Sequence, residues 1–186
     1  MRLTEKVHQI LAEQLQPGDL VIDATAGNGH DTQFLAEQTG TAGHVIAIDI
    51  QASAIESTRQ RLISQGLEQH VTLYTSDHAA QLEALRPSQG ERVTAVVFNL
   101  GYLPGSDKAV QTQSNNTRKA LEASLHLLRP AGLLCVTAYR GHPGGAEESQ
   151  AVETWMRLQE NSGHLLECYE PQANNTPPIL WVLHKR

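Results

Sequence analysis

The chain alternates between two kinds of hydrophobic spacing. Segments with an apolar residue every three to four positions predict amphipathic helices, and short runs rich in valine, isoleucine and leucine predict buried strands. Helices are expected at residues 3–15, 31–38, 52–65, 79–85, 108–128 and 147–160. Strands are expected at residues 20–23, 44–49, 71–74, 93–98, 133–138, 165–170 and 179–184. This alternation predicts an α/β fold with a mostly parallel sheet and helices on both faces.

The boundaries of these elements follow from breakers and spacing. Pro87 is expected to stop the fourth helix, and Pro130 and Gly132 to close the fifth. The last two strands are too close in sequence for a crossover helix, so the final strand should run antiparallel. Seven strands of this kind resemble the class I methyltransferase (Rossmann-like) sheet more than a dehydrogenase sheet. No linker or repeat is visible, so one domain over residues 1–186 is expected.

Composition narrows the possible partners. Of the 186 residues, 40% are hydrophobic and 18% are charged, which is ordinary globular usage. The net charge of −6 argues against a broad basic surface for nucleic acid. An RNA substrate would need a local patch, for which the sequence offers few cations: Lys108, Arg118, Lys119, Arg140, Lys185 and Arg186.

The sequence has no features of a membrane or secreted protein. No apolar run reaches the roughly 18–20 residues of a membrane helix, and the amino-terminal segment lacks the apolar stretch of a signal peptide. Cys135 and Cys168 lie in apolar runs, where they are expected to be buried thiols of a reducing compartment. No metal-ligand spacing accompanies them. We therefore expect a cytoplasmic protein without a metal.

The sharpest local signal is the turn between the first strand and the next helix. It reads V-I-D-A-T-A-G-N-G from Val21 to Gly29, and glycines there let the backbone approach a ligand at a helix N-terminus. Asp49 ends the second strand, where a carboxylate can accept both hydroxyls of a ribose. Such a turn also occurs without any ligand, and Asp31 would then only favour the helix dipole.

The sign of the charge distinguishes between two cofactors. Carboxylates at Asp23 and Asp31 would repel the pyrophosphate of a dinucleotide, and they suit the ammonium and sulfonium groups of S-adenosylmethionine. This disfavours an NAD-dependent oxidoreductase. We expect a site for S-adenosylmethionine that includes Asp23, Thr25, Gly27, Asn28, Gly29, Asp31 and Asp49.

Residues after the third strand offer a place for adenine. Asp77 could accept a hydrogen bond from the exocyclic amine, and the backbone of His78 could donate to a ring nitrogen. The alternative is that Ser76 and Asp77 only cap the next helix.

A second polar segment follows the central strand. Asn99, with Tyr102 three residues later, looks like a variant of the Asn-Pro-Pro-Tyr motif of amino-methyltransferases, although Leu100-Gly101 replaces the two prolines. In that motif the asparagine oxygen holds the target amine, and the aromatic ring packs against the base. The alternative is a turn whose residues serve backbone geometry alone.

Several motifs together carry a family resemblance. They are D-A-T-A-G-N-G-H-D-T from Asp23, D-I-Q from Asp49, N-L-G-Y-L-P-G-S-D-K from Asn99 and Y-R-G-H-P-G-G from Tyr139. Over nearly its whole length the chain resembles the bacterial YtqB/MnmM-type tRNA methyltransferases, long labelled rRNA methylases.

The resemblance implies methylation of the amine of 5-aminomethyl-2-thiouridine at a tRNA wobble position. It also implies a homodimer and a set of cofactor contacts: Gly27, Asn28, Asp31, Asp49, Gln51, Asp77 and His78. Methylation of rRNA or of a small amine is the alternative reaction, and a non-catalytic nucleotide- or RNA-binding module is the second alternative.

The reaction needs a neutral amine, so a group must take its proton. Candidates are Asp107, His142 and Glu148, of which His142 has the most suitable ordinary pKa. A contact between His142 and a substrate phosphate is equally compatible. We therefore expect Asn99, Tyr102 and His142 to be the catalytic residues.

Overall fold

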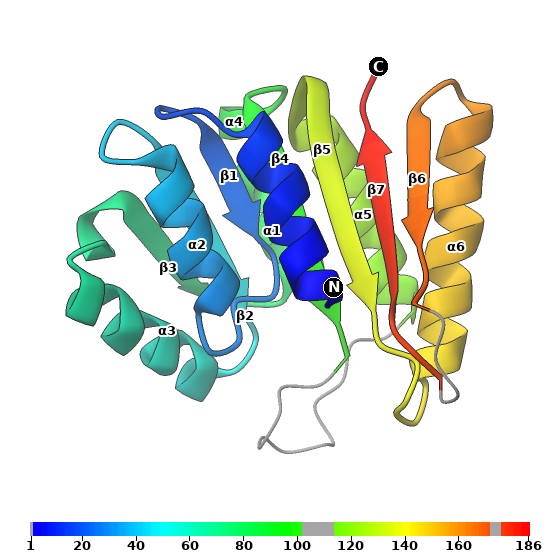
Figure 1. The fold of residues 1–186 in the computed structure, drawn as a ribbon, viewed down its shortest axis with the longest axis horizontal. Helices are drawn as coiled ribbons and strands as arrows, with labels where there is room; N and C mark the ends of the chain where they lie inside the picture. Colours follow the sequence, from blue (N-terminus) through cyan, green and yellow to red (C-terminus); the bar gives the residue numbers. More distant parts are fainter. Residues whose placement is uncertain (1, 102–113, 172–175) are drawn as a thin grey trace.

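The computed structural model describes residues 2–101, 114–171 and 176–186. The described residues form a seven-stranded sheet in the order β3-β2-β1-β4-β5-β7-β6 (Figure 1). Its strands are β1 (Leu20–Asp23), β2 (His44–Asp49), β3 (Val71–Thr75), β4 (Val93–Leu100), β5 (Leu128–Ala138), β6 (Leu165–Tyr169) and β7 (Ile179–His184). β7 runs antiparallel to both β5 and β6, and the other pairings are parallel. The predicted fold class is confirmed.

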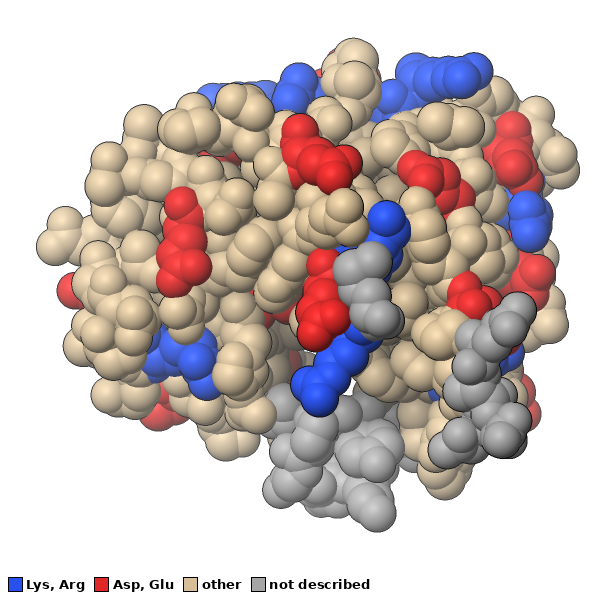
Figure 2. Space-filling view, in the orientation of Figure 1, with Lys and Arg blue, Asp and Glu red and all other residues tan. Residues whose placement is uncertain are grey.

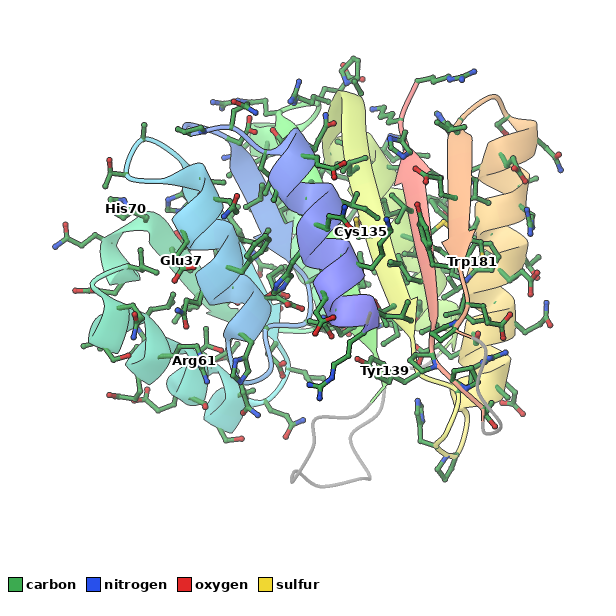
Figure 3. The ribbon with its side chains drawn as sticks, viewed as in Figure 1. Glu37, Arg61, His70, Cys135, Tyr139 and Trp181 are labelled. Carbon is green, nitrogen blue, oxygen red and sulfur yellow. The ribbon has the colours of Figure 1, made fainter. Side chains whose placement is uncertain are left out.

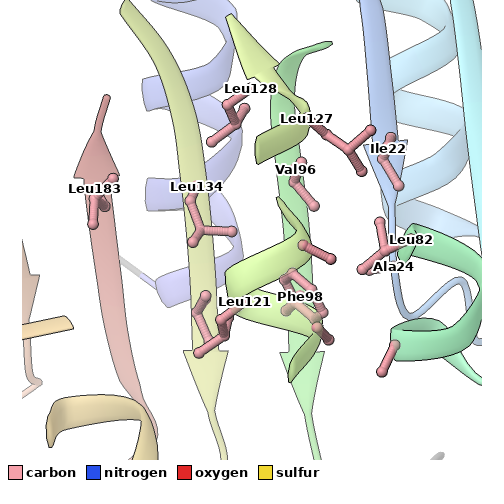
Figure 4. Close-up of a cluster of buried hydrophobic side chains, with 14 of the residues drawn as sticks. Ile22, Ala24, Leu82, Val96, Phe98, Leu121, Leu127, Leu128, Leu134 and Leu183 are labelled. Atoms are coloured by element: carbon pink, nitrogen blue, oxygen red, sulfur yellow. The ribbon is translucent and has the colours of Figure 1, made fainter. Parts of the chain in front are cut away.

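Helices cover both faces of this sheet. They are α1 (Leu3–Gln14), α2 (His30–Thr39), α3 (Ala52–Gln65), α4 (His78–Gln89), α5 (Ser114–Leu127) and α6 (Gly145–Asn161). On one face α1 and α2 pack through residues such as Leu11 and Leu35 against Val21 and Val97. α4, α5 and α6 pack on the opposite face, around Phe98 (Figure 4). No helix in the described ranges has the length and apolarity that a membrane span requires.

The apolar run in the central strand β4 is long because the strand is buried on both faces of the sheet. Both faces of the strand are covered by helices, and every residue from Val93 to Leu100 is buried except Asn99. Asn99 therefore lies inside the strand, near its carboxyl end, and not in a turn after it. The parallel ladder with β1 ends at Asp23, which pairs with Val97, so β4 extends beyond its neighbour.

Among the described residues, two predicted boundaries differ from the structure by more than two residues. α4 continues through Pro87 to Gln89, because a proline in the last turn removes a single helical hydrogen bond, and the Gly90 N–H still donates to the Arg86 carbonyl at 3.0 Å. β5 already begins at Leu128, and the pairing with β4 is irregular between Val93 and Ala95. The expected start of the fifth helix at residues 108–113 lies outside the described residues.

Candidate functional site

A cavity of about 1110 Å³ opens at the carboxyl end of the sheet. Strand β1 lies between β2 and β4 there, at the point where the strand order reverses, which is where open α/β sheets bind ligands. Most of the predicted site residues line this one cavity: Thr25, Gly27, Asn28, Asp31, Asp49, Gln51, Asp77, His78, Asn99 and His142. Asp23 and Gly29 do not line it, and Tyr102 lies outside the described residues.

Asp23 is buried beneath the turn. Its carboxylate accepts hydrogen bonds from the Thr32 hydroxyl at 2.6 Å and from the Thr25 N–H at 3.2 Å. Burial, reinforced by the nearby negative charge of Asp31, raises the pKa of Asp23 to about 7. The expectation that Asp23 faces a sulfonium group is therefore corrected. Its carboxyl group holds the turn in place from the inside of the protein.

Gly29 also shapes the site without lining it. Its φ is +78°, and a Cβ at this position would lie 2.9 Å from the Thr58 Cα in α3. The Thr58 hydroxyl donates to the Gly27 carbonyl at 3.1 Å, which fixes the other side of the turn. Glycine is thus required here because α3 packs against the turn, and the predicted ligand contact at Gly29 is corrected to a packing role.

Asp49 supports the turn from the neighbouring strand. One carboxylate oxygen accepts from the Gly27 N–H at 2.9 Å, and the other accepts from the Gln51 N–H at 2.9 Å. Each oxygen keeps a further lone pair for a donor in the cavity. The arrangement therefore presents an oriented carboxylate at the carboxyl end of β2.

Asp77 and His78 begin α4 at the cavity. Asp77 caps the helix by accepting from the Ala80 N–H at 2.9 Å, and it also accepts from the Asn116 amide. The capping interpretation is confirmed for Asp77 but not for Ser76, whose hydroxyl donates to the Asp77 carbonyl, and the position of Asp77 in the cavity fits an adenine contact as well. His78 is buried against the edge of Phe98, and burial lowers its pKa. Its Nε2 atom has no hydrogen-bond partner within the described part of the chain.

Asn99 is held at two points. Its backbone N–H donates to the Thr25 hydroxyl, and its side-chain amide donates to the Asp31 carboxylate, both at 2.7 Å. The amide nitrogen thereby faces Asp31, so Asn99 can offer its amide oxygen to a donor in the cavity.

Asp31 has a second partner that no sequence motif includes. His8 of α1 places Nε2 2.7 Å from the other carboxylate oxygen of Asp31. Burial alone would raise the pKa of Asp31, but the hydrogen bonds from His8 and Asn99 outweigh it, and the net shift is downward. Asp31 is therefore an ionised carboxylate at the cavity wall. No sequence pattern indicated His8, because its place beside Asp31 comes from the packing of α1, whose Thr4, one turn earlier, lines the cavity.

The opposite wall comes from β5 and the loop after it. Tyr139, at the carboxyl end of the sheet (Figure 3), is partly exposed to the cavity, and burial together with the charge of Asp31 raises its pKa. The Nδ1 atom of the His142 ring lies 3.0 Å from the Pro143 carbonyl oxygen. A Cβ on Gly145 would lie 2.8 Å from the His142 Nε2 atom, so the loop folds closely around the imidazole.

The other candidate bases are placed differently. Glu148 is 2% exposed, accepts from the Thr117 hydroxyl at 2.5 Å and does not line the cavity. The expectation that it could act as the base is therefore corrected, because its position in the first turn of α6 is covered by α5. Asp107 lies outside the described residues.

Basic side chains are sparse around the cavity. Lys119 and Arg140 line it, and Arg140 also pairs with Glu170 at 2.5 Å. Lys185 instead donates to the Leu128 carbonyl, at the far end of the sheet. Figure 2 shows Lys and Arg intermixed with Asp and Glu on the visible face. Among the described residues, no cluster of histidine, cysteine and carboxylate side chains could hold a metal ion.

Comparison with known proteins identifies relatives over the whole chain. The family model described as "Putative rRNA methylase" matches residues 45–184. The tRNA (mnm(5)s(2)U34)-methyltransferase of Arabidopsis thaliana chloroplasts is 38% identical, with an alignment covering 100% of this chain and 70% of that protein.

Two solved structures are similar to this chain over its whole length. A "putative rRNA-methylase" from Clostridium thermocellum has a TM-score of 0.93 and 34% identity, covering 100% of this chain and 98% of that one. A "putative methyltransferase" from Streptococcus mutans, solved in complex with SAH, has a TM-score of 0.87 and 32% identity, covering 100% and 99%.

Proposed function

The chain belongs to the rRNA methylase family of class I methyltransferases, and on that premise we propose that it transfers a methyl group from S-adenosylmethionine to an amine on tRNA. The observation that carries the proposal is the position of Asn99. Its amide is anchored by Asp31 and lies in the same cavity as the glycine turn and the Asp49 carboxylate. A methyl donor bound at the turn would therefore lie beside a side chain that could hold the acceptor amine.

The cofactor would occupy the β1–β2 side of the cavity. Asp49 would accept from the ribose hydroxyls, and Asp77 and His78 would flank the adenine. The ionised Asp31 would attract the positive charges of the donor. The S. mutans relative, which was crystallised with SAH, supports this choice of ligand.

The reaction would be an in-line displacement. The neutral amine nitrogen attacks the methyl carbon, the S–CH₃ bond breaks, and S-adenosylhomocysteine leaves with the electron pair. Asn99 would accept an N–H of the amine through its amide oxygen and so aim the lone pair, which makes positioning the main source of rate. The amine proton would leave to a base, for which His142 is the described candidate at the cavity.

The substrate is proposed from the relatives and from the size of the cavity. The Arabidopsis relative is named for the modified wobble uridine of tRNA, and we assign the amine of 5-aminomethyl-2-thiouridine in the anticodon to this chain. The cavity, about 1110 Å³, lies near the upper end of the ~300–1,000 Å³ range of small-molecule pockets, a volume that is compatible with a base beside the donor. Lys119 and Arg140 would meet the RNA backbone at its rim.

Methyl transfer from labelled S-adenosylmethionine into total tRNA of cells lacking the gene tests the proposal. Mass analysis of the nucleosides should show 5-aminomethyl-2-thiouridine converted to its methylated form. Label found in rRNA or in a small amine would identify the alternative substrates. Calorimetry that shows no binding of S-adenosylmethionine would favour a non-catalytic module.

We also propose a homodimer, from the resemblance to the tRNA methyltransferases, and a cytoplasmic location. Cys135 is a buried free thiol, which suits a reducing compartment, whereas Cys168 is an exposed free thiol, so the expectation of burial is wrong for Cys168. Light scattering of the purified chain tests the homodimer, and a mass of one chain would reject it.

A further inference from the structure

Three side chains from separate elements form a continuous hydrogen-bonded chain that ends at the acceptor side of the cavity. His8 of α1 contacts one oxygen of Asp31 at the start of α2, and Asn99 of β4 contacts the other oxygen, each at 2.7 Å. Asp31 has a lowered pKa and is an ionised acceptor, so the imidazole Nε2 must be the donor.

Packing of His8 on Phe34 does not by itself require the hydrogen bond to Asp31. Val7, Leu11 and Leu15 bury the apolar face of α1 against the sheet, and Phe34 packs against the same cluster. The imidazole stacks on Phe34 of α2 at 3.9 Å between ring centroids and 3° between planes. Its side chain is 28% exposed, so water could satisfy the ring without Asp31. The stacked orientation instead directs Nε2 at the carboxylate.

The carboxylate orientation controls the amide orientation. An asparagine amide can present either its oxygen or its nitrogen by a half rotation. With Asp31 fixed by His8, the nitrogen of Asn99 is held at the carboxylate and the oxygen is left for the acceptor. Without His8, the charge of Asp31 still selects the amide nitrogen, but the carboxylate can rotate about its last torsion, and the amide that it holds loses its exact position.

We propose that His8 is a positioning residue for methyl transfer, which sets the amide of Asn99 through the carboxylate of Asp31. This inference rests on the proposed function. It adds α1, an element outside the strand–helix units that form the cofactor turn, to the machinery that aligns the amine.

Two variants separate the hydrogen bond from the packing. His8→Phe keeps a ring that stacks on Phe34 but removes the N–H donor. His8→Gln removes the ring and restores a donor, because the glutamine Nε2 reaches about as far as the imidazole Nε2. Gln9→Ala, on the exposed side of α1, is the control.

We expect His8→Phe to lower kcat about 10-fold or more, as small misplacements of reacting groups do. The KM for tRNA, the Kd for S-adenosylmethionine and the Tm should stay near their wild-type values. His8→Gln should recover most of the lost kcat. In ¹⁵N spectra, the Asn99 side-chain amide should change its shift in His8→Phe and return toward the wild-type shift in His8→Gln.

The outcomes distinguish this inference from the function. A wild-type kcat in His8→Phe, or equal losses in both variants, overturns the role of His8 while the enzyme remains a methyltransferase. A wild-type chain that methylates no RNA overturns the function, and the amide spectra then still decide whether His8 holds Asn99.

Discussion

The side-chain amide of Asn99 donates to the carboxylate of Asp31 across 2.7 Å, and this contact joins the central strand to the first turn of α2. The two residues are 68 positions apart in the chain. The contact places a neutral amide and a negative carboxylate on the same wall of the cavity. A cationic methyl donor and a neutral amine can therefore be bound by adjacent groups that do not repel either of them.

Replacing Asn99 with alanine should reduce kcat by about 10²-fold, because the amine would lose the group that aims its lone pair. The Kd for S-adenosylmethionine should change little, since Asp31 keeps its charge and its bond to His8. Single-turnover methyl transfer and calorimetry measure the two quantities. Asn99→Ala with undiminished kcat would mean that Asn99 does not hold the acceptor.

Asp49→Ala should weaken binding of S-adenosylmethionine by about 10-fold or more, because a hydrogen bond between a charged group and its partner contributes roughly 1.5–3 kcal/mol. The variant also removes the carboxylate that accepts hydrogen bonds from the N–H groups of Gly27 and Gln51. Calorimetry with donor and with S-adenosylhomocysteine measures the effect. Glu56→Ala, on the exposed side of α3, is the control, and equal affinities in the two variants would exclude a ribose contact.

The sequence was most informative where one physical effect dominated. The apolar run of β4 is buried on both faces, so its position could be predicted from hydrophobicity alone. The carboxyl ends of parallel strands meet at one edge, which is why Asp49, Asp77 and Asn99 could be assigned to a common site. The prediction at Pro87 is wrong because one proline removes only one helical hydrogen bond, and α4 continues past it for two residues to Gln89.

The remaining features depend on tertiary contacts that local patterns do not encode. Asp23 was expected to face the cavity from the sign of its charge, but it points inward to Thr32. His8 reaches Asp31 only because α1 packs across the sheet beside α2. The need for glycine at position 29 comes from Thr58, on a helix that follows another strand.

Gly29→Ala should destabilise the fold more than Gly66→Ala. Both glycines have positive φ, +78° and +67°, so both substitutions carry the same backbone strain of roughly 1–2 kcal/mol. At Gly29 the new Cβ would also meet Thr58 at 2.9 Å, whereas at Gly66 nothing lies within 4 Å. The collision should add about 1–3 kcal/mol to the cost at Gly29. Urea unfolding of the two variants measures the difference. Equal losses in the free energy of unfolding would show that α3 shifts to accommodate the added methyl group without an energetic penalty.

The last prediction concerns the pH dependence of stability at Asp23. Burial raises the pKa of this carboxyl group from 3.8 to about 7, so between these values the folded state holds a proton that the unfolded state releases. The stabilising contribution of the protonated form is complete below an unfolded pKa of about 3.9 and is lost as pH rises toward 7. Three pKa units correspond to roughly 4 kcal/mol.

Asp23→Asn keeps the shape, because its oxygen can accept from the Thr25 N–H and its NH2 group can donate to the Thr32 hydroxyl oxygen, but it cannot ionise. The free energy of unfolding of the natural chain should therefore fall from about pH 5 to pH 8 more steeply than that of Asp23→Asn. Urea unfolding at several pH values measures both slopes. All other titratable groups are the same in the two proteins, so their contributions cancel in the difference between the slopes. Parallel slopes would mean that Asp23 is ionised in the folded protein, and the buried carboxyl group could not then hold the turn as a neutral partner of Thr32.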